Sequence, residues 1–198
     1  MKESTLRWLR AVIPVVVLVL ALLVVYSLLS TPAPTGWMVV RASALFAYVT
    51  LFLAIVSSEY QREMRKLFGQ PYMRVHHWLA RVGLVLIVLH PVLIAVLSKD
   101  PRVFVPRFTP WRVLLSLGGR PALYLFFIAA LAGVFRARVK NPWKVIHWLS
   151  YLAFLLAFAH AWLLGSTVAT GPLRPIWLMM AVVVVIVWLH KRLSGRRA

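Results

Sequence analysis

Residues 76–97 read HHWLARVGLVLIVLHPVLIAVL, and this stretch decides the fold class. It is long enough to cross the hydrocarbon core of a bilayer as a helix, which takes about 20 mainly apolar residues. A helix satisfies its backbone hydrogen bonds within one segment, as lipid requires. The stretch nevertheless contains His76 and His90. Because an ionisable residue inside a span is costly, we expect these histidines to serve a function.

The composition of the whole chain agrees with a membrane protein. Of 198 residues 62% are hydrophobic, whereas soluble domains are about 45–50% apolar. The 23 Lys and Arg residues outnumber the four Asp and Glu residues, and the net charge is +19. A soluble nucleic-acid binder would carry such charge on a folded core, but here the basic residues separate long apolar runs. We therefore expect an integral membrane protein, with lipid and not nucleic acid as its surroundings.

The distribution of apolar runs predicts an all-α bundle of six transmembrane helices in one domain, residues 1–198. The expected spans are about 11–29, 37–56, 76–97, 121–135, 145–164 and 176–189. A transmembrane barrel would show alternating segments of about ten residues, and runs such as VVVLVLALLVV at 15–25 do not alternate.

The basic residues predict the orientation of the bundle. Fifteen of the 23 Lys and Arg residues lie on the side of both termini, seven lie on the other side, and Arg81 lies within the third span. Since loops rich in Lys and Arg stay inside, we expect cytoplasmic termini in a multi-pass protein of the bacterial inner membrane. The longest outer connection is 98–119, and its segment 111–117 is expected to form a short interfacial helix. This connection serves either as a docking surface for a partner or as a tether on the headgroups.

The fifth expected span also carries two histidines, His147 and His160. The third and fifth spans run in the same direction, and both histidine separations correspond to about 20 Å along a helix. His76 should therefore lie level with His147, and His90 with His160. Neutral imidazoles bind iron from either side of a porphyrin, so these four residues are the candidate metal and haem ligands.

Helix phase tests this arrangement. Fourteen residues return to within about 40° of the same face, which favours His76 over His77 as the partner of His90. Thirteen residues miss by about 140°, so the fifth span needs a tilt, a bulge or ligation from different sides of the helix.

Several other interpretations remain open. His90 and His160 can instead donate hydrogen bonds between helices, and His190 is expected at the surface. Arg81 and Arg41 either contact a haem propionate or extend to the headgroups.

Two rival functions follow from these readings. One is a proton-coupled transporter that uses the buried histidines, and the other is a structural subunit without a cofactor. The acids argue against the transporter, because relays usually include carboxylates and all four acids are expected in tails or loops: Glu3, Glu59, Glu63 and Asp100.

Cysteine is absent from the chain. This excludes disulfides, thiolate-held zinc, iron–sulfur clusters and covalently attached haem. A redox cofactor would have to be held without cysteine sulfur.

The histidine motifs resemble those of ferric reductase-like transmembrane domains. The sequence His76-His77-Trp78-Leu79-Ala80, followed by His90-Pro91, is similar to the third-helix pattern of that family. The series Trp143, His147, Tyr151 and His160 is similar to the fifth-helix pattern. The resemblance implies two b-type haems between these helices, with His76 paired to His147 and His90 to His160, and electron transfer across the membrane.

The chain departs from the larger members of that family. Only His190–Ala198 follow the sixth expected span, and the sequence contains no Gly-rich dinucleotide loop. It is similar in size to the haem-binding membrane subunit of the bacterial methionine sulfoxide reductase system. The resemblance therefore implies the electron-transfer subunit of an oxidoreductase. A flavin would lie at the cytoplasmic face or on a cytoplasmic flavin reductase, and a redox partner would lie on the outer side.

Overall fold

The computed structural model describes residues 3–68, 72–169 and 171–194, and in these ranges it contains helices and no strands. The longer helices are α1 (Glu3–Ser30), α2 (Thr35–Glu59), α4 (Tyr72–Ser98), α6 (Gly119–Val134), α9 (Leu149–Leu164) and α11 (Leu173–Ser194). The shorter ones are α3 (Gln61–Phe68), η1 (Pro101–Phe104), α5 (Trp111–Ser116), α7 (Arg136–Val139), α8 (Trp143–His147) and α10 (Ser166–Ala169). The expected all-α fold is confirmed.

Five helical segments in the described ranges are long and apolar enough to cross a membrane: Arg10–Ser30, Thr35–Glu59, Met73–Ser98, Trp143–Leu164 and Leu173–His190. They correspond to the first, second, third, fifth and sixth expected spans, and the chain is an integral multi-pass membrane protein. The fourth expected span coincides with α6, an apolar helix of 16 residues. At about 1.5 Å per residue α6 is about 24 Å long, shorter than a hydrocarbon core of about 30 Å. A sixth crossing therefore stays a prediction.

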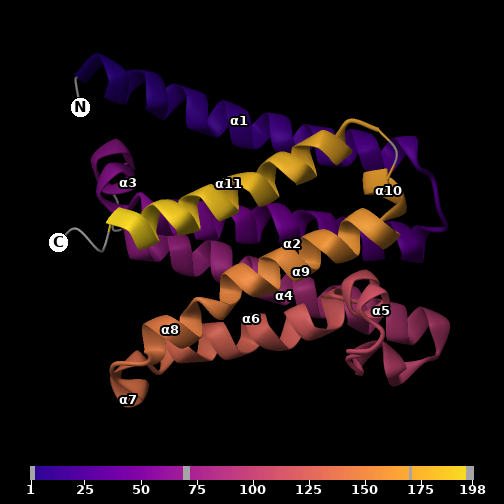
Figure 1. The fold of residues 1–198 in the computed structure, drawn as a ribbon. Helices are drawn as coiled ribbons and strands as arrows, with labels where there is room; N and C mark the ends of the chain where they lie inside the picture. Colours follow the sequence, from indigo (N-terminus) through magenta and orange to yellow (C-terminus); the bar gives the residue numbers. More distant parts are fainter. Residues whose placement is uncertain (1–2, 69–71, 170, 195–198) are drawn as a thin grey trace.

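The long helices run side by side along one direction of the molecule (Figure 1). The first turns of α1 and the last turns of α11 lie at the same end, together with α3, α7 and α8, while α5 and α10 lie at the opposite end (Figure 1). This arrangement places both ends of the chain on one side of the bundle. The assignment of that side to the cytoplasm stays a prediction from the basic residues.

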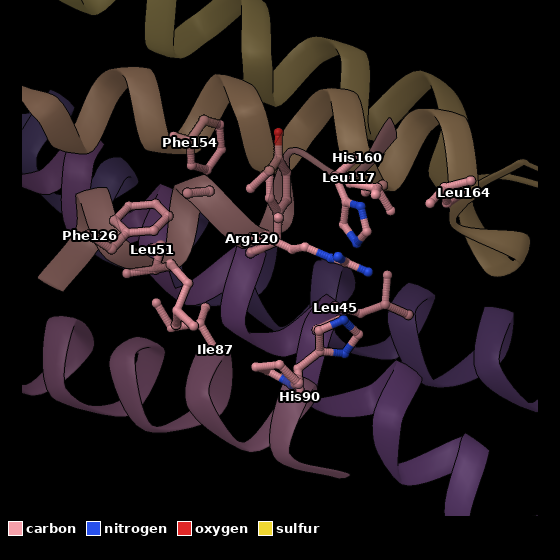
Figure 2. Close-up of a pocket in the computed structure, with 18 of the residues that line it drawn as sticks. Leu45, Leu51, Ile87, His90, Leu117, Arg120, Phe126, Phe154, His160 and Leu164 are labelled. Carbon is pink, nitrogen blue, oxygen red and sulfur yellow. The ribbon is translucent and has the colours of Figure 1, made fainter. Parts of the chain in front are cut away.

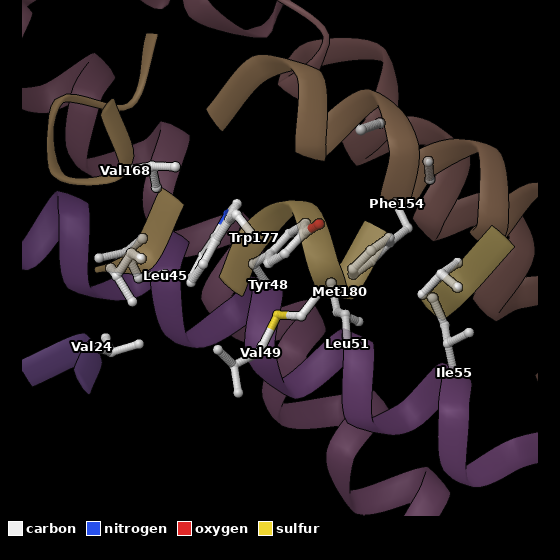
Figure 3. Packing of buried hydrophobic residues seen from close by; sticks show 14 of the residues in the cluster. Val24, Leu45, Tyr48, Val49, Leu51, Ile55, Phe154, Val168, Trp177 and Met180 are labelled. Atoms are coloured by element: carbon white, nitrogen blue, oxygen red, sulfur yellow. The ribbon is translucent and has the colours of Figure 1, made fainter. Parts of the chain in front are cut away.

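Three stacked aromatic rings from three helices form the centre of the core (Figure 3). Tyr48 of α2 lies 4.3 Å from Phe154 of α9 and 4.8 Å from Trp177 of α11, measured between ring centres. Phe154 and Trp177 are fully buried. Large apolar side chains on the outer faces of α1, α4 and α11 are exposed. A soluble protein would rarely leave such extended apolar surfaces uncovered, whereas lipid covers them in a membrane.

The connection between α4 and α6 folds back onto α6. Asp100 caps η1, and both of its carboxylate oxygens accept hydrogen bonds from the Arg102 side chain, at 2.9 and 3.2 Å. These bonds lower the pKa of Asp100. The Tyr124 hydroxyl of α6 donates to the Phe104 carbonyl, 2.9 Å away. The short helix expected at 111–117 is present as α5, so the 98–119 connection is a folded part of the site described below.

Gly83 of α4 lets this helix lie close to α2. A Cβ atom at Gly83 would lie 2.7 Å from Cδ2 of Leu51, which is buried in the core. Small residues commonly permit such close approach between membrane helices. Gly36 of α2 differs, because its nearest neighbour would be the exposed side chain of Leu97, 3.1 Å away.

We expect Gly83→Ala to destabilise the protein by about 1–3 kcal/mol, because Leu51 must leave its packed position. Gly36→Ala is the matched control. Leu97 can move aside, and alanine favours helix over glycine by about 1 kcal/mol, so this variant should be neutral or stabilised. Thermal unfolding in detergent micelles measures both effects. Equal stability of the two variants would contradict the proposed packing role of Gly83.

Candidate functional site

The structure brings the four candidate histidines together in two pairs, each between α4 and the segment formed by α8 and α9. The ring centres of His76 and His147 lie 6.3 Å apart, with an interplanar angle of 66°. Those of His90 and His160 lie 6.4 Å apart, with an angle of 70°. The pairing is the one expected from the spacing, and it creates two levels along the bundle.

A backbone carbonyl orients each of the four rings through Nδ1. His76 Nδ1 lies 3.1 Å from the Ala54 oxygen, and His90 Nδ1 lies 3.0 Å from the Val40 oxygen, both on α2. His147 Nδ1 lies 2.8 Å from the Ala129 oxygen on α6. His160 Nδ1 lies 2.6 Å from the Ser116 oxygen on α5.

These hydrogen bonds select one tautomer of the imidazoles. A carbonyl oxygen only accepts hydrogen bonds, so Nδ1 carries the proton in each ring and the lone pair of the neutral ring lies on Nε2. Metal-binding histidines are typically held in this way, with the other ring nitrogen donating to a carbonyl or carboxylate. All four rings therefore have the protonation pattern of a metal ligand.

The ring separations also fit a shared metal ion. With metal–nitrogen bonds of about 2.0–2.1 Å and about 1.1 Å from each nitrogen to its ring centre, two imidazoles on opposite sides of one metal lie about 6.3 Å apart. Among the residues that the structure describes, no cluster of three or more His, Cys, Asp or Glu side chains could hold a metal. Two imidazoles alone are an incomplete set for zinc, but they supply the two axial positions of a haem, whose ring supplies the remaining four nitrogens.

A largely apolar cavity of about 290 Å³ lies at the level of His90 and His160 (Figure 2). Its volume lies just below the usual range for small-molecule sites, about 300–1,000 Å³. Residues from α2, α4, α6, α9 and α11 line it, and most of them are aliphatic or aromatic. Tyr48 and Trp177 also line it, and the Tyr48 hydroxyl and Trp177 Nε1 are buried without a hydrogen-bond partner within the described ranges. The cavity thus combines apolar walls, two imidazoles and few polar groups, which suits a porphyrin.

A tightened turn at Trp148 changes the helix phase of the fifth span. Here α8 ends at His147 and α9 begins at Leu149. The Tyr151 amide bonds to the Trp148 carbonyl three residues earlier, at 3.0 Å. A 3₁₀ turn has three residues per turn and winds about 20° more per residue than an α-helix. Thirteen residues fall about 140° short of four α-helical turns, so the extra winding rotates His147 in the direction that the pairing needs.

The remaining predicted residues lie outside the two pairs. His77 and His190 are exposed, and it is His76 that faces His147. Arg81 is exposed beside Trp78, with its guanidinium carbon 5.8 Å from the ring centre, as expected for a side chain that extends to the headgroups. Arg41 instead donates to the Thr31 carbonyl, 2.8 Å away, directly after the end of α1. That bond satisfies an unpaired carbonyl at a helix end, a role that neither sequence interpretation included.

The expectation that all acids lie in tails or loops is wrong for Glu59. This residue ends α2, and its carboxylate accepts a hydrogen bond of 2.6 Å from the Tyr151 hydroxyl. Tyr151 follows His147 by four residues, directly after the tightened turn at Trp148. The contact joins α2 to α9 near the His76–His147 pair. The sequence shows that Tyr151 lies four residues after His147. It does not indicate the acidic partner of Tyr151, because Glu59 lies 92 residues away in the chain.

Two glycines, Gly119 and Gly133, border the imidazoles, and the sequence did not identify either as a site residue. A Cβ atom at Gly119 would lie 2.9 Å from Cδ2 and 3.1 Å from Nε2 of His160. At Gly133 it would lie 3.4 Å from Nδ1 of His147, which is ordinary van der Waals contact. Gly119 therefore has to remain without a side chain for His160 to keep its position.

We expect Gly119→Ala to displace the His160 ring and to weaken haem binding at the level of His90 and His160. Gly133→Ala is the matched control and should keep the wild-type haem content. The haem-to-protein ratio from a pyridine haemochrome assay measures the effect. A full haem complement with an unchanged visible spectrum in Gly119→Ala would contradict this role.

A comparison with protein families finds a match. The family model described as ferric reductase like transmembrane component matches residues 35–158, which is more than half of the chain. The matched region contains His76, His90 and His147. The fourth paired histidine, His160, lies two residues beyond it. Neither the curated proteins nor the solved structures contain a match.

Proposed function

Because the chain belongs to the ferric reductase-like transmembrane family, we propose that it transfers electrons across the membrane through two b-type haems. The haem ligands are His76 with His147 and His90 with His160. The observation that supports this proposal most directly is the orientation of all four imidazoles through Nδ1 by backbone carbonyls. A histidine with a purely structural role would need a hydrogen bond at one ring nitrogen. It would not need a second histidine opposite it on the neighbouring helix whose ring is held in the same way.

Each part of the chain has a definable role in this proposal. A bound haem supplies the one-electron chemistry of its iron. The carbonyl groups of α2, α5 and α6 hold the imidazoles in one tautomer and make Nε2 more basic. The apolar walls exclude water from the space between the helices. Since two histidines would hold each bound haem, the arrangement favours electron transfer over binding of a substrate to the metal.

We place the electron donor and the acceptor on opposite sides of the membrane. The donor is a flavin at the cytoplasmic face or on a cytoplasmic flavin reductase, and the acceptor is a redox partner or substrate on the outer side. The chain would thus be the haem-binding subunit of an oxidoreductase in the bacterial inner membrane. The predicted orientation, with cytoplasmic termini, puts His76 and His147 at the inner level and His90 and His160 at the outer level.

The proton-coupled transporter is less well supported by the same contacts. A proton relay needs partners that both accept and release protons, usually carboxylates and histidines in series. The Nδ1 atoms of the four histidines contact backbone carbonyls, which do not exchange protons in this way. The Glu59–Tyr151 contact lies at only one of the two levels.

We expect the purified protein to show a reducible b-type haem spectrum with two haems per chain. His90→Ala or His160→Ala should remove the outer haem, about half of the total, because one axial ligand is lost. His76→Ala or His147→Ala should remove the inner haem instead. Redox titration followed by visible absorption, combined with a haemochrome assay, measures both the number and the identity of the haems.

The exposed histidines supply the controls for this experiment. His77→Ala and His190→Ala should retain both haems, because neither ring belongs to a pair. A colourless wild-type protein would refute the haem proposal, and retention of both haems in the four ligand variants would refute the ligand assignment.

A further inference from the structure

The cavity at the level of His90 and His160 is called the outer cavity below. Arg120, the second residue of α6, is the one permanently charged side chain among the residues that line it. The other residues that line the cavity are apolar or neutral, apart from the two imidazoles. In Figure 2 its guanidinium group extends between His160 and His90. An arginine is always protonated in a protein, so it brings a positive charge into otherwise apolar surroundings.

The hydrogen bonds of the described residues leave this charge without an anion. Arg120 Nη1 donates to the Val105 carbonyl, 2.9 Å away, which uses one of five N–H donors. The acid in the same connection, Asp100, has both oxygens bonded to Arg102. The two side chains form an ion pair. Arg120 is partly exposed, and its hydrogen bond to Val105 is exposed, so its remaining N–H donors are open to an anionic partner at the edge of the cavity.

The fold fixes Arg120 and His160 relative to each other. Gly119 precedes Arg120 directly, and a Cβ atom at Gly119 would lie 2.9 Å from Cδ2 of His160. The Ser116 carbonyl, at the end of α5, holds the Nδ1 atom of the same ring, and the Val105 carbonyl holds the guanidinium. One segment, residues 105–120, therefore positions both the imidazole and the cation. A ligand bound through His160 would meet Arg120 at its edge.

The chemistry of arginine indicates which group it binds. The planar guanidinium matches a carboxylate through two parallel hydrogen bonds. A b-type haem is an apolar ring that carries two carboxylates as propionate groups. Arg41 and Arg81, the earlier candidates for this contact, are otherwise engaged or exposed: Arg41 bonds to Thr31, and Arg81 lies beside Trp78.

We propose that Arg120 binds a propionate carboxylate of the outer haem, oriented for this by the Val105 carbonyl of the outer connection. This assignment rests on the proposed haem-binding function. It gives the 98–119 connection a role in the site itself: it supplies the carbonyl acceptors for both Arg120 and His160.

The test compares Arg120→Gln with Arg120→Lys in the purified, haem-loaded protein in detergent. Arg112→Gln is the matched control, because Arg112 is an exposed arginine of α5 that lies against Trp111 and does not line the outer cavity. In Arg120→Gln, one of the two haems should be lost to an excess of a haem-free globin at least about tenfold faster, the range expected for a lost charged hydrogen bond. Arg120→Lys should be intermediate, and Arg112→Gln should match the wild type.

Two further measurements distinguish a carboxylate contact from a general packing role. The midpoint potential of the outer haem should fall in Arg120→Gln, because a nearby positive charge favours the reduced state, which carries one more electron. The propionate bending band in the resonance Raman spectrum should also shift in Arg120→Gln and stay in place in Arg112→Gln.

The inner haem of the same molecules reports folding, since it should keep its spectrum and its rate of loss. An unchanged outer potential and propionate band in Arg120→Gln would overturn the assignment, even if haem loss were faster. A headgroup partner for Arg120 would give that result. A wild-type protein without haem would instead refute the proposed function, so the two failures are distinguishable.

Discussion

The hydrogen bonds between four imidazole Nδ1 atoms and four backbone carbonyls are the interactions on which the site depends. They join α4 to α2 at two levels, and they join α8 and α9 to α6 and α5. In a membrane interior such bonds have no competition from water, so they both orient the rings and hold neighbouring helices in register. The same contacts thus connect the packing of the bundle to the chemistry proposed for it.

Close approach of the helices makes those contacts possible. Gly83 lets α4 lie against Leu51 of α2, and Gly119 lets the start of α6 reach the His160 ring. On the other side, the stacked rings of Tyr48, Phe154 and Trp177 hold α2, α9 and α11 together. Small residues therefore lie where helices meet the imidazoles, and large aromatic residues fill the centre of the core.

Charged side chains are distributed according to what each can reach. Arg41 satisfies a carbonyl at the end of α1, and Arg102 pairs with Asp100 in the outer connection. Arg192 lies over the Trp148 ring, with its guanidinium carbon 3.9 Å from the ring centre, and so supports the turn after His147. Glu59 and Tyr151 join α2 to α9 near the His76–His147 pair. Most of these contacts stabilise ends of helices, where backbone groups are otherwise unpaired.

The sequence by itself determined the helical membrane fold and the two-level pairing of His76 with His147 and of His90 with His160. Long apolar runs in lipid have few alternatives to the helix. Similar histidine spacing along two helices that run in the same direction places the histidines at the same two depths in the membrane. Only the tertiary structure decided how the rings are held. The carbonyls of Ala54, Val40, Ala129 and Ser116 are backbone groups, which carry no residue-specific signal. The turn at Trp148, the Glu59–Tyr151 contact and the position of Arg120 likewise depend on which segments meet in space. Such contacts between segments distant in the chain have no local pattern that a sequence could display.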